Sequence, residues 1–399
     1  MSNQRHPIAQ RAHELTADLV QWRRQMHMYP EPSMREHRTA AYVIERLREI
    51  GIGEIQEGVG ETGVVAIVRG QGDRCVALRA DMDALELKEE TGAEYASRID
   101  GMMHACGHDG HTACLLGAGA ILQAMRDTLP GCVKLLFQPG EEAIAGARRM
   151  IEDGCLQDPA PEAAVALHVM PEVTAGVIGL TPGYITARCD AADIAVIGTA
   201  SHAARPHEGA DAISLAAQAL VMIQQFVARS TDPIHRKVVT FGKIGGGTRR
   251  NIIAERVDLC GTIRSYEPET RDAIVDLIEQ RLPKIIAELG GRLEVTVTEG
   301  CPALWNDEHV LACAEAAACE VLGSESVEVV PEPSMGSEDF ALFAQMGELP
   351  VAMLQLGTRD ESRGHIHPVH TTKFDFNDEV VLPAGAAVLA NTAVKLLEE

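Results

Sequence analysis

The fold is decided by three stretches of sequence, RCVALRA (Arg74–Ala80), TACLLGAGAILQAMR (Thr112–Arg126) and CVKLLF (Cys132–Phe137). The first and the third are short apolar runs of strand length, whereas the second has the length and composition of a helix. A further strand-like run, AAVALH (Ala163–His168), follows a second helical segment, Glu141–Glu152. Strands that alternate with helices predict an α/β domain, with a mostly parallel mixed sheet and helices on both faces.

The order of predicted elements changes between residues 186 and 297. There it becomes strand, helix, strand, strand, helix, strand, which is the arrangement of ferredoxin-like domains. The predicted strands are Ala192–Ile197, Lys237–Lys243, Arg256–Ile263 and Arg292–Val297, and the predicted helices are Ala210–Ala228 and Glu267–Leu289. We therefore predict a ferredoxin-like α+β domain (186–297) inserted into the α/β domain (1–185 and 298–399), which ends in a helix from about Asp378.

Composition and charge narrow the class of protein. The chain has 399 residues, 46% of them hydrophobic, and a formal net charge of −23. A surface this negative repels phosphate groups, so nucleic acid and anionic membranes are not expected as partners. The polar start of the chain and the lack of an apolar run of about 18 residues predict a cytoplasmic protein. Ten cysteines without a CxxC pair are expected to be reduced thiols.

Potential metal ligands gather in two short histidine-rich stretches, HACGHDGH (His104–His111) and GHIHPVH (Gly364–His370). Three further patches follow directly on predicted strands: Asp81 with Asp83, Glu141 with Glu142, and His168 alone. The carboxyl ends of parallel strands meet at one edge of a sheet, where ligands bind in open α/β folds. The sequence thus predicts that these patches converge on one crevice.

HACGHDGH contains the cysteine, histidine and carboxylate set that zinc and similar ions prefer. A structural zinc site, or a helix start that happens to carry imidazoles, is the alternative. Structural zinc sites typically show repeated CxxC or HxxxH pairs. Here there is no CxxC, and the single HxxxH pair, His104 with His108, is not repeated, so an open catalytic site is favoured.

The other patches have simpler alternatives too. Glu141 and Glu142 suit the first turn of any helix, but in this crevice one carboxylate can bind metal while its neighbour removes a proton from water. Asp81 and Asp83 can orient a ligand histidine or merely cap a loop. His168 can be an ordinary core histidine, and His202 an ordinary surface histidine. The glycines of GGGTRRN (Gly245–Asn251) lack a nucleotide-binding pattern.

Taken together, the chain resembles the aminoacylase/carboxypeptidase family of metallopeptidases, and within it the amidohydrolase branch. The resemblance runs nearly end to end, and HACGHDGHTA followed by QPGEE is its most specific part. The matching stretches are MHMYPEPS (26–33), RADMDAL (79–85), MHACGHDGHTA (103–113), FQPGEE (137–142), ALHV (166–169), SHAARPHEGAD (201–211), GGTRRNIIAE (246–255), GTIRSY (261–266), GSEDF (336–340) and HTTKFDFND (370–378).

The resemblance implies roles for individual residues. It makes Cys106, His108, Glu142, His168 and His370 the ligands of two divalent ions (zinc, manganese, cobalt or nickel), and Glu141 the general base. Asp83 and His202 are further expected in the catalytic group, with Asn251, Arg264 and His207 at the substrate. The substrate would be an N-acyl amino acid. The inserted domain would act as a lid and as the contact surface of a homodimer or a dimer of dimers, carrying His202 into the partner's site.

Two departures from the branch, Thr372 and Glu86, occupy positions where relatives usually have proline, and they leave every functional group in place. Three alternative functions remain: a dipeptidase or carboxypeptidase of the same family, an esterase, and a metal- or ligand-binding relative that has lost catalysis. The presence of Glu141 argues against the last, because such a protein has no use for the base.

Overall fold

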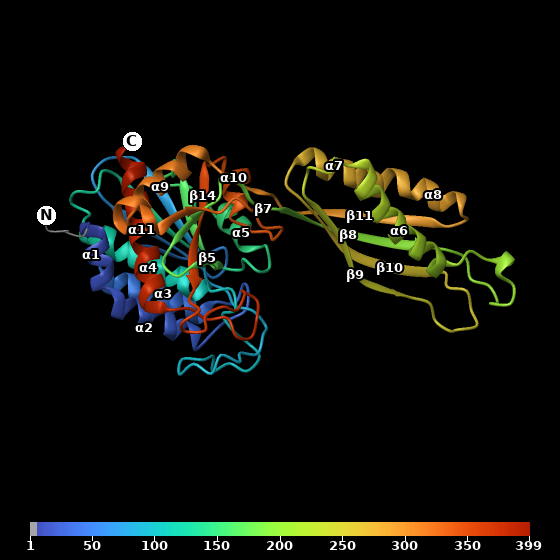
Figure 1. The fold of residues 1–399 in the computed structure, drawn as a ribbon, viewed down its shortest axis with the longest axis horizontal. Helices are drawn as coiled ribbons and strands as arrows, with labels where there is room; N and C mark the ends of the chain where they lie inside the picture. The colour runs from blue at the N-terminus through green and yellow to red at the C-terminus, as the bar shows by residue number, and fades with distance from the viewer. Residues whose placement is uncertain (1–5) are drawn as a thin grey trace. The chain divides into compact units, whose positions relative to one another are not determined.

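The computed structural model describes residues 6–399, which form two compact units (Figure 1). Unit 1 comprises the chain up to Ile185 together with Trp305–Glu332 and Asp339–Glu399. Unit 2 comprises Thr186–Leu304 and a short excursion, Pro333–Glu338. The excursion was not predicted from sequence. It belongs to unit 2 because the amide of Ala187 donates to the carbonyl of Gly336 (2.8 Å) and Arg264 donates to the carbonyl of Met335 (2.9 Å).

Unit 1 is built on a mixed sheet of eight strands, as the α/β prediction required. The strands lie in the order β1-β2-β4-β3-β5-β14-β6-β13, and the central run β4-β3-β5-β14 is parallel. The antiparallel pairs are β1 with β2, β2 with β4, and β6 with β14. The bounds are β1 Glu54–Val59, β2 Gly63–Arg69, β3 Cys75–Asp81, β4 Cys132–Gln138, β5 Ala164–Thr174, β6 Ile178–Leu180, β13 Val327–Val329 and β14 Val351–Arg359.

Helices cover both faces of this sheet because neighbouring strand residues point to opposite sides. Leu78 and Leu135 join the apolar core shared with α4 (His108–Ala124) and α11 (Asp378–Glu398). The next residue, Arg79, points the other way, and its guanidinium lies 5.6 Å from the ring centre of Phe340 at the start of α10. The remaining helices of unit 1 are α1 Pro7–Glu14, α2 Thr16–His27, α3 His37–Ile50, α5 Gly146–Glu152, α9 Glu308–Leu322 and α10 Ala341–Gly347.

Unit 2 is an antiparallel sheet in the order β11-β8-β10-β9, with its helices on one face (Figure 1). Buried residues such as Ile194 and Leu259 on the sheet pack with Ile223 and Ile278 on the helices. In chain order the elements are β8 Arg188–Ile197, α6 Ala212–Ser230, β9 Lys237–Gly246, β10 Arg256–Ser265, α7 Pro268–Asp276, a π-helical segment Leu277–Arg281, α8 Leu282–Glu288 and β11 Arg292–Cys301. A separate pair of short strands is formed by β7 (Gly183–Thr186) and β12 (Leu304–Asn306).

Among the helices of residues 6–399, α6 and α11 are long and apolar enough to cross a membrane, although the sequence showed no unbroken apolar run of that length. In α11, 78% of the apolar window is buried inside the unit, so the core accounts for its composition. In α6 only 33% is buried, and Ile213 and Val221 are exposed on its outer side.

Candidate metal centre and active site

The predicted ligands come from four places at the carboxyl edge of the unit 1 sheet. Cys106 and His108 flank the start of α4, and His168 lies within β5. Glu142 sits in a turn after β4, because the predicted helix begins at Gly146 rather than at Glu141. His370 lies in the long loop between β14 and α11.

The structure brings these five side chains together in two overlapping triads that share Cys106, one with His108 and His168 and the other with Glu142 and His370. Bond lengths of about 2.0–2.3 Å imply separations of roughly 3.3–3.5 Å between ligand atoms around a tetrahedral ion. The observed separations cluster near this value. They are Cys106 Sγ to His168 Nε2 3.4 Å, Cys106 Sγ to His370 Nε2 3.2 Å, His370 Nε2 to Glu142 Oε1 3.2 Å and His108 Nε2 to Glu142 Oε1 4.0 Å.

The backbone has a positive φ at the ligand His370 and at Gly107, which follows the ligand Cys106. Gly107 has a φ of 83°, and a Cβ there would lie 2.6 Å from Val169 Cγ2, so only glycine fits between Cys106 and α4. His370 has a φ of 60°, which is unusual for a residue with a side chain. Its amide donates to the carbonyl of Ala105 at 2.7 Å, which fixes this conformation beside Cys106.

Charge at the centre favours a thiolate. Burial opposes ionisation of Cys106, but the imidazoles of His108 and His168 outweigh it and lower the pKa of the thiol to about 6. The hydrogen bond of His370 with Cys106 and its ion pair with Glu142 raise the pKa of that imidazole to about 10. In the metal-free protein the thiolate is therefore balanced by protonated imidazoles, which must lose their protons when a metal binds.

The residues fit divalent cations. Within residues 6–399, His108 Nε2 and Glu142 Oε1 are buried without a hydrogen-bond partner, although His370 Nε2 approaches Glu142 as an ion pair. A buried polar atom without a partner is unfavourable, and an ion would satisfy both atoms. Thiolate, imidazole and carboxylate together are the ligand set of zinc and its neighbours.

Asp83 forms hydrogen bonds that fix the positions of several residues of the centre. Its Oδ1 accepts from His108 Nδ1 at 3.1 Å and from the amide of Glu141 at 3.2 Å. Its Oδ2 accepts from the amide of Glu142 at 3.0 Å and from the Ser33 hydroxyl at 2.6 Å. These bonds leave His108 Nε2 free for a metal, which is the usual arrangement around ligand histidines. Sequence reasoning missed Ser33, although it lies in the matching stretch MHMYPEPS.

Asp81 hydrogen-bonds a different histidine, although its Oδ2 also lies 3.7 Å from His108 Nε2. It accepts from His111 Nδ1 at 2.6 Å, and His111 Nε2 accepts from the amide of Val169 at 2.9 Å. Both ring nitrogens of His111 are thus engaged with the protein. With no ring nitrogen left to bind a metal, His111 supports the structure around the centre and is not a ligand.

Glu141 lies beside the ligands. One of its carboxylate oxygens is within 4.8 Å of the ligand atoms of His108 and Glu142, and the residue is only 7% exposed. A buried carboxylate at this distance can exchange a proton with a molecule held at the centre.

The site residues predicted in the inserted domain all lie in unit 2 or its loops. His202 is exposed, and its Nδ1 accepts from the amide of Ala204 at 3.1 Å. Asn251 lies close by, because its carbonyl accepts from the amide of Ala203 at 3.1 Å. His207 is exposed and faces Glu208 at 3.9 Å, while Arg264 lies on β10. Unit 2 therefore brings His202 and Asn251 together, but Arg264 takes part in a different contact, with Met335.

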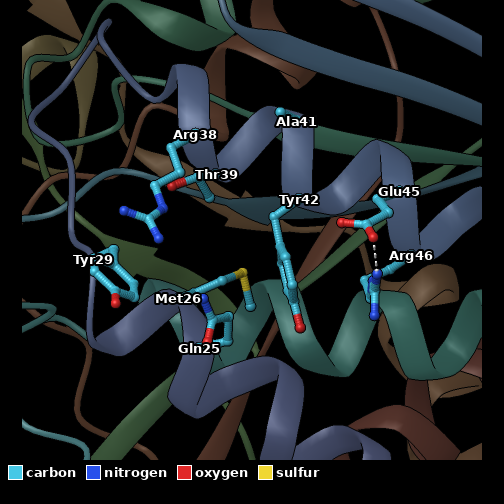
Figure 2. Close-up of a pocket in the computed structure, with 9 residues that line it drawn as sticks. All are labelled: Gln25, Met26, Tyr29, Arg38, Thr39, Ala41, Tyr42, Glu45 and Arg46. Atoms are coloured by element: carbon cyan, nitrogen blue, oxygen red, sulfur yellow. Dashed lines mark ion pairs between the residues drawn. The ribbon is translucent and has the colours of Figure 1, made fainter.

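A hollow of about 460 Å³ lies elsewhere, between α2 and α3 (Figure 2). Its side chains include Tyr29, over whose ring the Arg38 guanidinium stacks at 3.4 Å, and Glu45, which pairs with Arg46 at 2.6 Å. No histidine or cysteine lines it, so it lacks the groups from which the metal centre is built.

Comparison with known proteins agrees with this geometry. The sequence pattern of Peptidase family M20/M25/M40 matches residues 77–395. Three similar proteins are thermostable carboxypeptidase 1 of Saccharolobus solfataricus (38% identical, 94% of this chain and 95% of that protein), N-acetyl-L-cysteine deacetylase of Bacillus subtilis (37%, 96% and 89%) and hippurate hydrolase of Campylobacter jejuni (33%, 96% and 98%). Among solved structures, the Bacillus subtilis YXEP protein, a dinuclear metal binding peptidase from the M20 family, superposes with a TM-score of 0.83 (31% identical, 96% of this chain and 99% of that chain).

Proposed function

The chain belongs to peptidase family M20/M25/M40 and is a metal-dependent hydrolase of amide bonds, and from this premise we propose that its substrate is an N-acyl amino acid. The products would be a carboxylic acid and a free amino acid. The observation that carries the proposal is the buried carboxylate of Glu141 beside the ligands His108 and Glu142. A site that only stored or sensed metal would not need it.

The centre would hold two divalent ions, with zinc, manganese, cobalt and nickel all compatible with its mixed ligands. When bound, the ions lower the pKa of a water molecule toward neutrality and polarise the amide carbonyl. Cys106, whose thiol pKa the neighbouring imidazoles lower to about 6, favours the softer ions of this set.

Glu141 would then move the proton. It accepts a proton from the attacking water as the oxygen bonds to the amide carbon, and it donates that proton to the amine as the carbon–nitrogen bond breaks. Asp83 keeps this carboxylate in place, since it accepts from the amides of both Glu141 and Glu142. Asp83 is therefore a positioning residue.

Unit 2 would serve as a ferredoxin-like lid and as a dimer contact. Its sheet order and its alternation of strands and helices support the ferredoxin-like fold. The apolar side chains exposed on α6 support the dimer contact. In this proposal His202 of each chain stabilises the oxyanion in the site of the partner, and Asn251, Arg264 and His207 contact the substrate. A cytoplasmic location belongs to the same proposal.

The proposed sharing of His202 can be tested by complementation. His202→Ala should lower turnover by roughly 10²–10³-fold, as the loss of other oxyanion donors does, without changing metal content. Mixing it with Glu141→Gln under subunit exchange should restore activity, because one site of each mixed dimer would carry neither change. A mixed dimer, verified by mass spectrometry, that stays inactive would refute the sharing.

A carboxypeptidase or dipeptidase is the second candidate, because a thermostable carboxypeptidase is 38% identical to this chain. A panel that crosses acetyl, benzoyl, indoleacetyl and long-chain acyl groups with several amino acids, run beside dipeptides, separates the two. We expect the highest kcat/KM on a simple acyl amino acid, with Glu141→Gln as the inactive control. A higher value on dipeptides would overturn the proposed substrate and leave the reaction unchanged.

A further inference from the structure

A second group of metal-binding side chains converges in unit 1, on the first turns of α9 and the end of α11. His309, Cys313 and Glu399 each offer one ligand atom, and these atoms lie within 4.8 Å of one another. The Glu399 Oε2 atom is 3.0 Å from His309 Nε2 and 3.2 Å from Cys313 Sγ. The third separation, from Cys313 Sγ to His309 Nε2, is 3.9 Å.

Regular secondary structure fixes the positions of the residues that carry these ligand atoms. His309 and Cys313 are four residues apart on α9, so they lie on one helix face. The start of that helix is fixed by Asp307, whose side chain accepts from the amides of His309 and Val310. Glu399 directly follows α11, which packs its buried face against α9, and Figure 1 shows this end of α11 close to α9. The cluster therefore joins two helices from distant parts of the sequence.

The separations fit one ion. Around a tetrahedral zinc, bond lengths of about 2.0–2.3 Å place nitrogen, oxygen and sulfur ligands roughly 3.3–3.5 Å apart. The values 3.0, 3.2 and 3.9 Å bracket this range, as do those of the catalytic centre. A shift of a few tenths of an ångström would suffice, and two of the three side chains are exposed and free to make it.

The surroundings allow entry and binding. The side chains of His309 and Glu399 are 69% and 52% exposed, so an ion can reach them from solvent. Cys313 is only 4% exposed, so its thiol is the buried ligand of the three. Both His309 Nε2 and the thiol of Cys313 contact the same carboxylate oxygen, Glu399 Oε2, and an ion would replace these two contacts with three bonds.

We propose that His309, Cys313 and Glu399 form a second metal site, separate from the catalytic centre, that binds a zinc-like divalent cation. With three protein ligands the fourth position falls to water. The bound ion ties the end of α11 to the start of α9, so its role is to stabilise unit 1. The site takes no part in amide hydrolysis.

Zinc content per chain tests the proposal. The purified enzyme is equilibrated with excess zinc, freed of unbound metal by gel filtration, and measured by elemental analysis. We expect three ions per chain in the wild type, and one fewer in both Cys313→Ser and Glu399→Gln. Glu399→Gln changes an exposed residue and guards against misfolding of the variant at the buried cysteine. Turnover should be unchanged in both.

Cys319→Ser is the matched control. It removes another thiol from the same helix, and its zinc content should equal that of the wild type. The proposal fails if either ligand variant retains the wild-type zinc content. It also fails if the lost ion is accompanied by a proportional loss of activity, because that ion would then have come from the catalytic centre. Absence of activity in every sample, wild type included, would count against the proposed substrate and not against this site.

Discussion

The two ligand clusters of unit 1 have the same kinds of side chains at similar separations, yet their charges differ. In the catalytic centre, the imidazoles of His108 and His168 overcome burial and lower the pKa of Cys106 to about 6. In the α9–α11 cluster, burial and the carboxylate of Glu399 raise the pKa of Cys313 to about 11. One cysteine is thus ionised before any metal arrives, and the other must release a proton to bind it.

This difference separates a catalytic site from a structural one. In the catalytic centre Cys106 and His108 are buried, His108 is oriented by Asp83, and a proton acceptor, Glu141, lies beside it. The α9–α11 cluster is open to solvent, and its single carboxylate is itself a ligand. Preorganised ligands lose less freedom on binding, so we expect the catalytic centre to bind metal more tightly.

Metal removal should have the largest effect. A strong chelator should empty both clusters and abolish turnover, because water without a metal is a poor nucleophile at neutral pH. On stepwise addition of zinc, activity should return fully with the first two ions per chain, and the third should add none. Turnover and metal content measured on the same samples check this. Full activity in a preparation without metal would contradict the mechanism.

The adjacent carboxylates should then respond differently to the same substitution. Glu141→Gln should lower kcat by about 10²–10⁴-fold, the range typical of general acid–base catalysis, while retaining metal. Glu142→Gln should instead lower metal content, because a ligand of one triad is lost. Neither change should affect the ion at Cys313. If Glu141→Gln loses metal and Glu142→Gln only loses rate, the two roles are reversed.

The meeting of the polar patches was predictable from sequence, because several of them follow strongly apolar strands. RCVALRA and CVKLLF mark buried strands, and the carboxylates after them, on Asp81, Asp83, Glu141 and Glu142, had to lie at the carboxyl edge of a parallel sheet. The choice of metal ligands among the patches came from the resemblance to the family. The turn at Glu141–Ile144 was not predictable in the same way. The turn ends at Ile144, whose backbone is in the left-handed region with a φ of 52°. The residues of this stretch are typical of a helix, so nothing in the sequence indicated that conformation.

The α9–α11 cluster and the excursion Pro333–Glu338 depend on tertiary contacts that leave no local pattern. The helix contributes only His309 and Cys313, and Glu399 lies 86 residues further along the chain. Likewise, the excursion joins unit 2 through single hydrogen bonds, such as that of Arg264 to Met335. The spacing of apolar residues predicts which face of a helix or strand is buried. It does not predict which polar residue from a distant part of the chain will contact that element.

Thiol reactivity compares the two cysteines directly in the metal-free protein. At pH 7 the thiolate fraction of Cys106 exceeds that of Cys313 by about 10⁴, but the lower pKa reduces intrinsic nucleophilicity by roughly 10². Alkylation should therefore be about 10–100 times faster at Cys106. Its rate should level off above pH 7, whereas the rate at Cys313, which faces Glu399 and Lys395, should keep rising toward pH 10. Mass spectrometry of each peptide measures both rates, and bound metal should protect both thiols. Equal pH profiles would contradict the charge difference.

The smallest expected effect is on thermal stability. With the catalytic ions already bound, free zinc at a hundredfold excess over the dissociation constant of the α9–α11 cluster adds about 2.7 kcal/mol. At roughly 2–4 °C per kcal/mol for large domains, the wild type should gain several degrees in Tm. Glu399→Gln should gain almost nothing, and Cys319→Ser should follow the wild type. All three ligands belong to unit 1, so if calorimetry resolves two transitions, only the transition of unit 1 should move. An equal rise in Glu399→Gln would mean that zinc stabilises the protein elsewhere, and the α9–α11 cluster would then be no more than three polar side chains in contact.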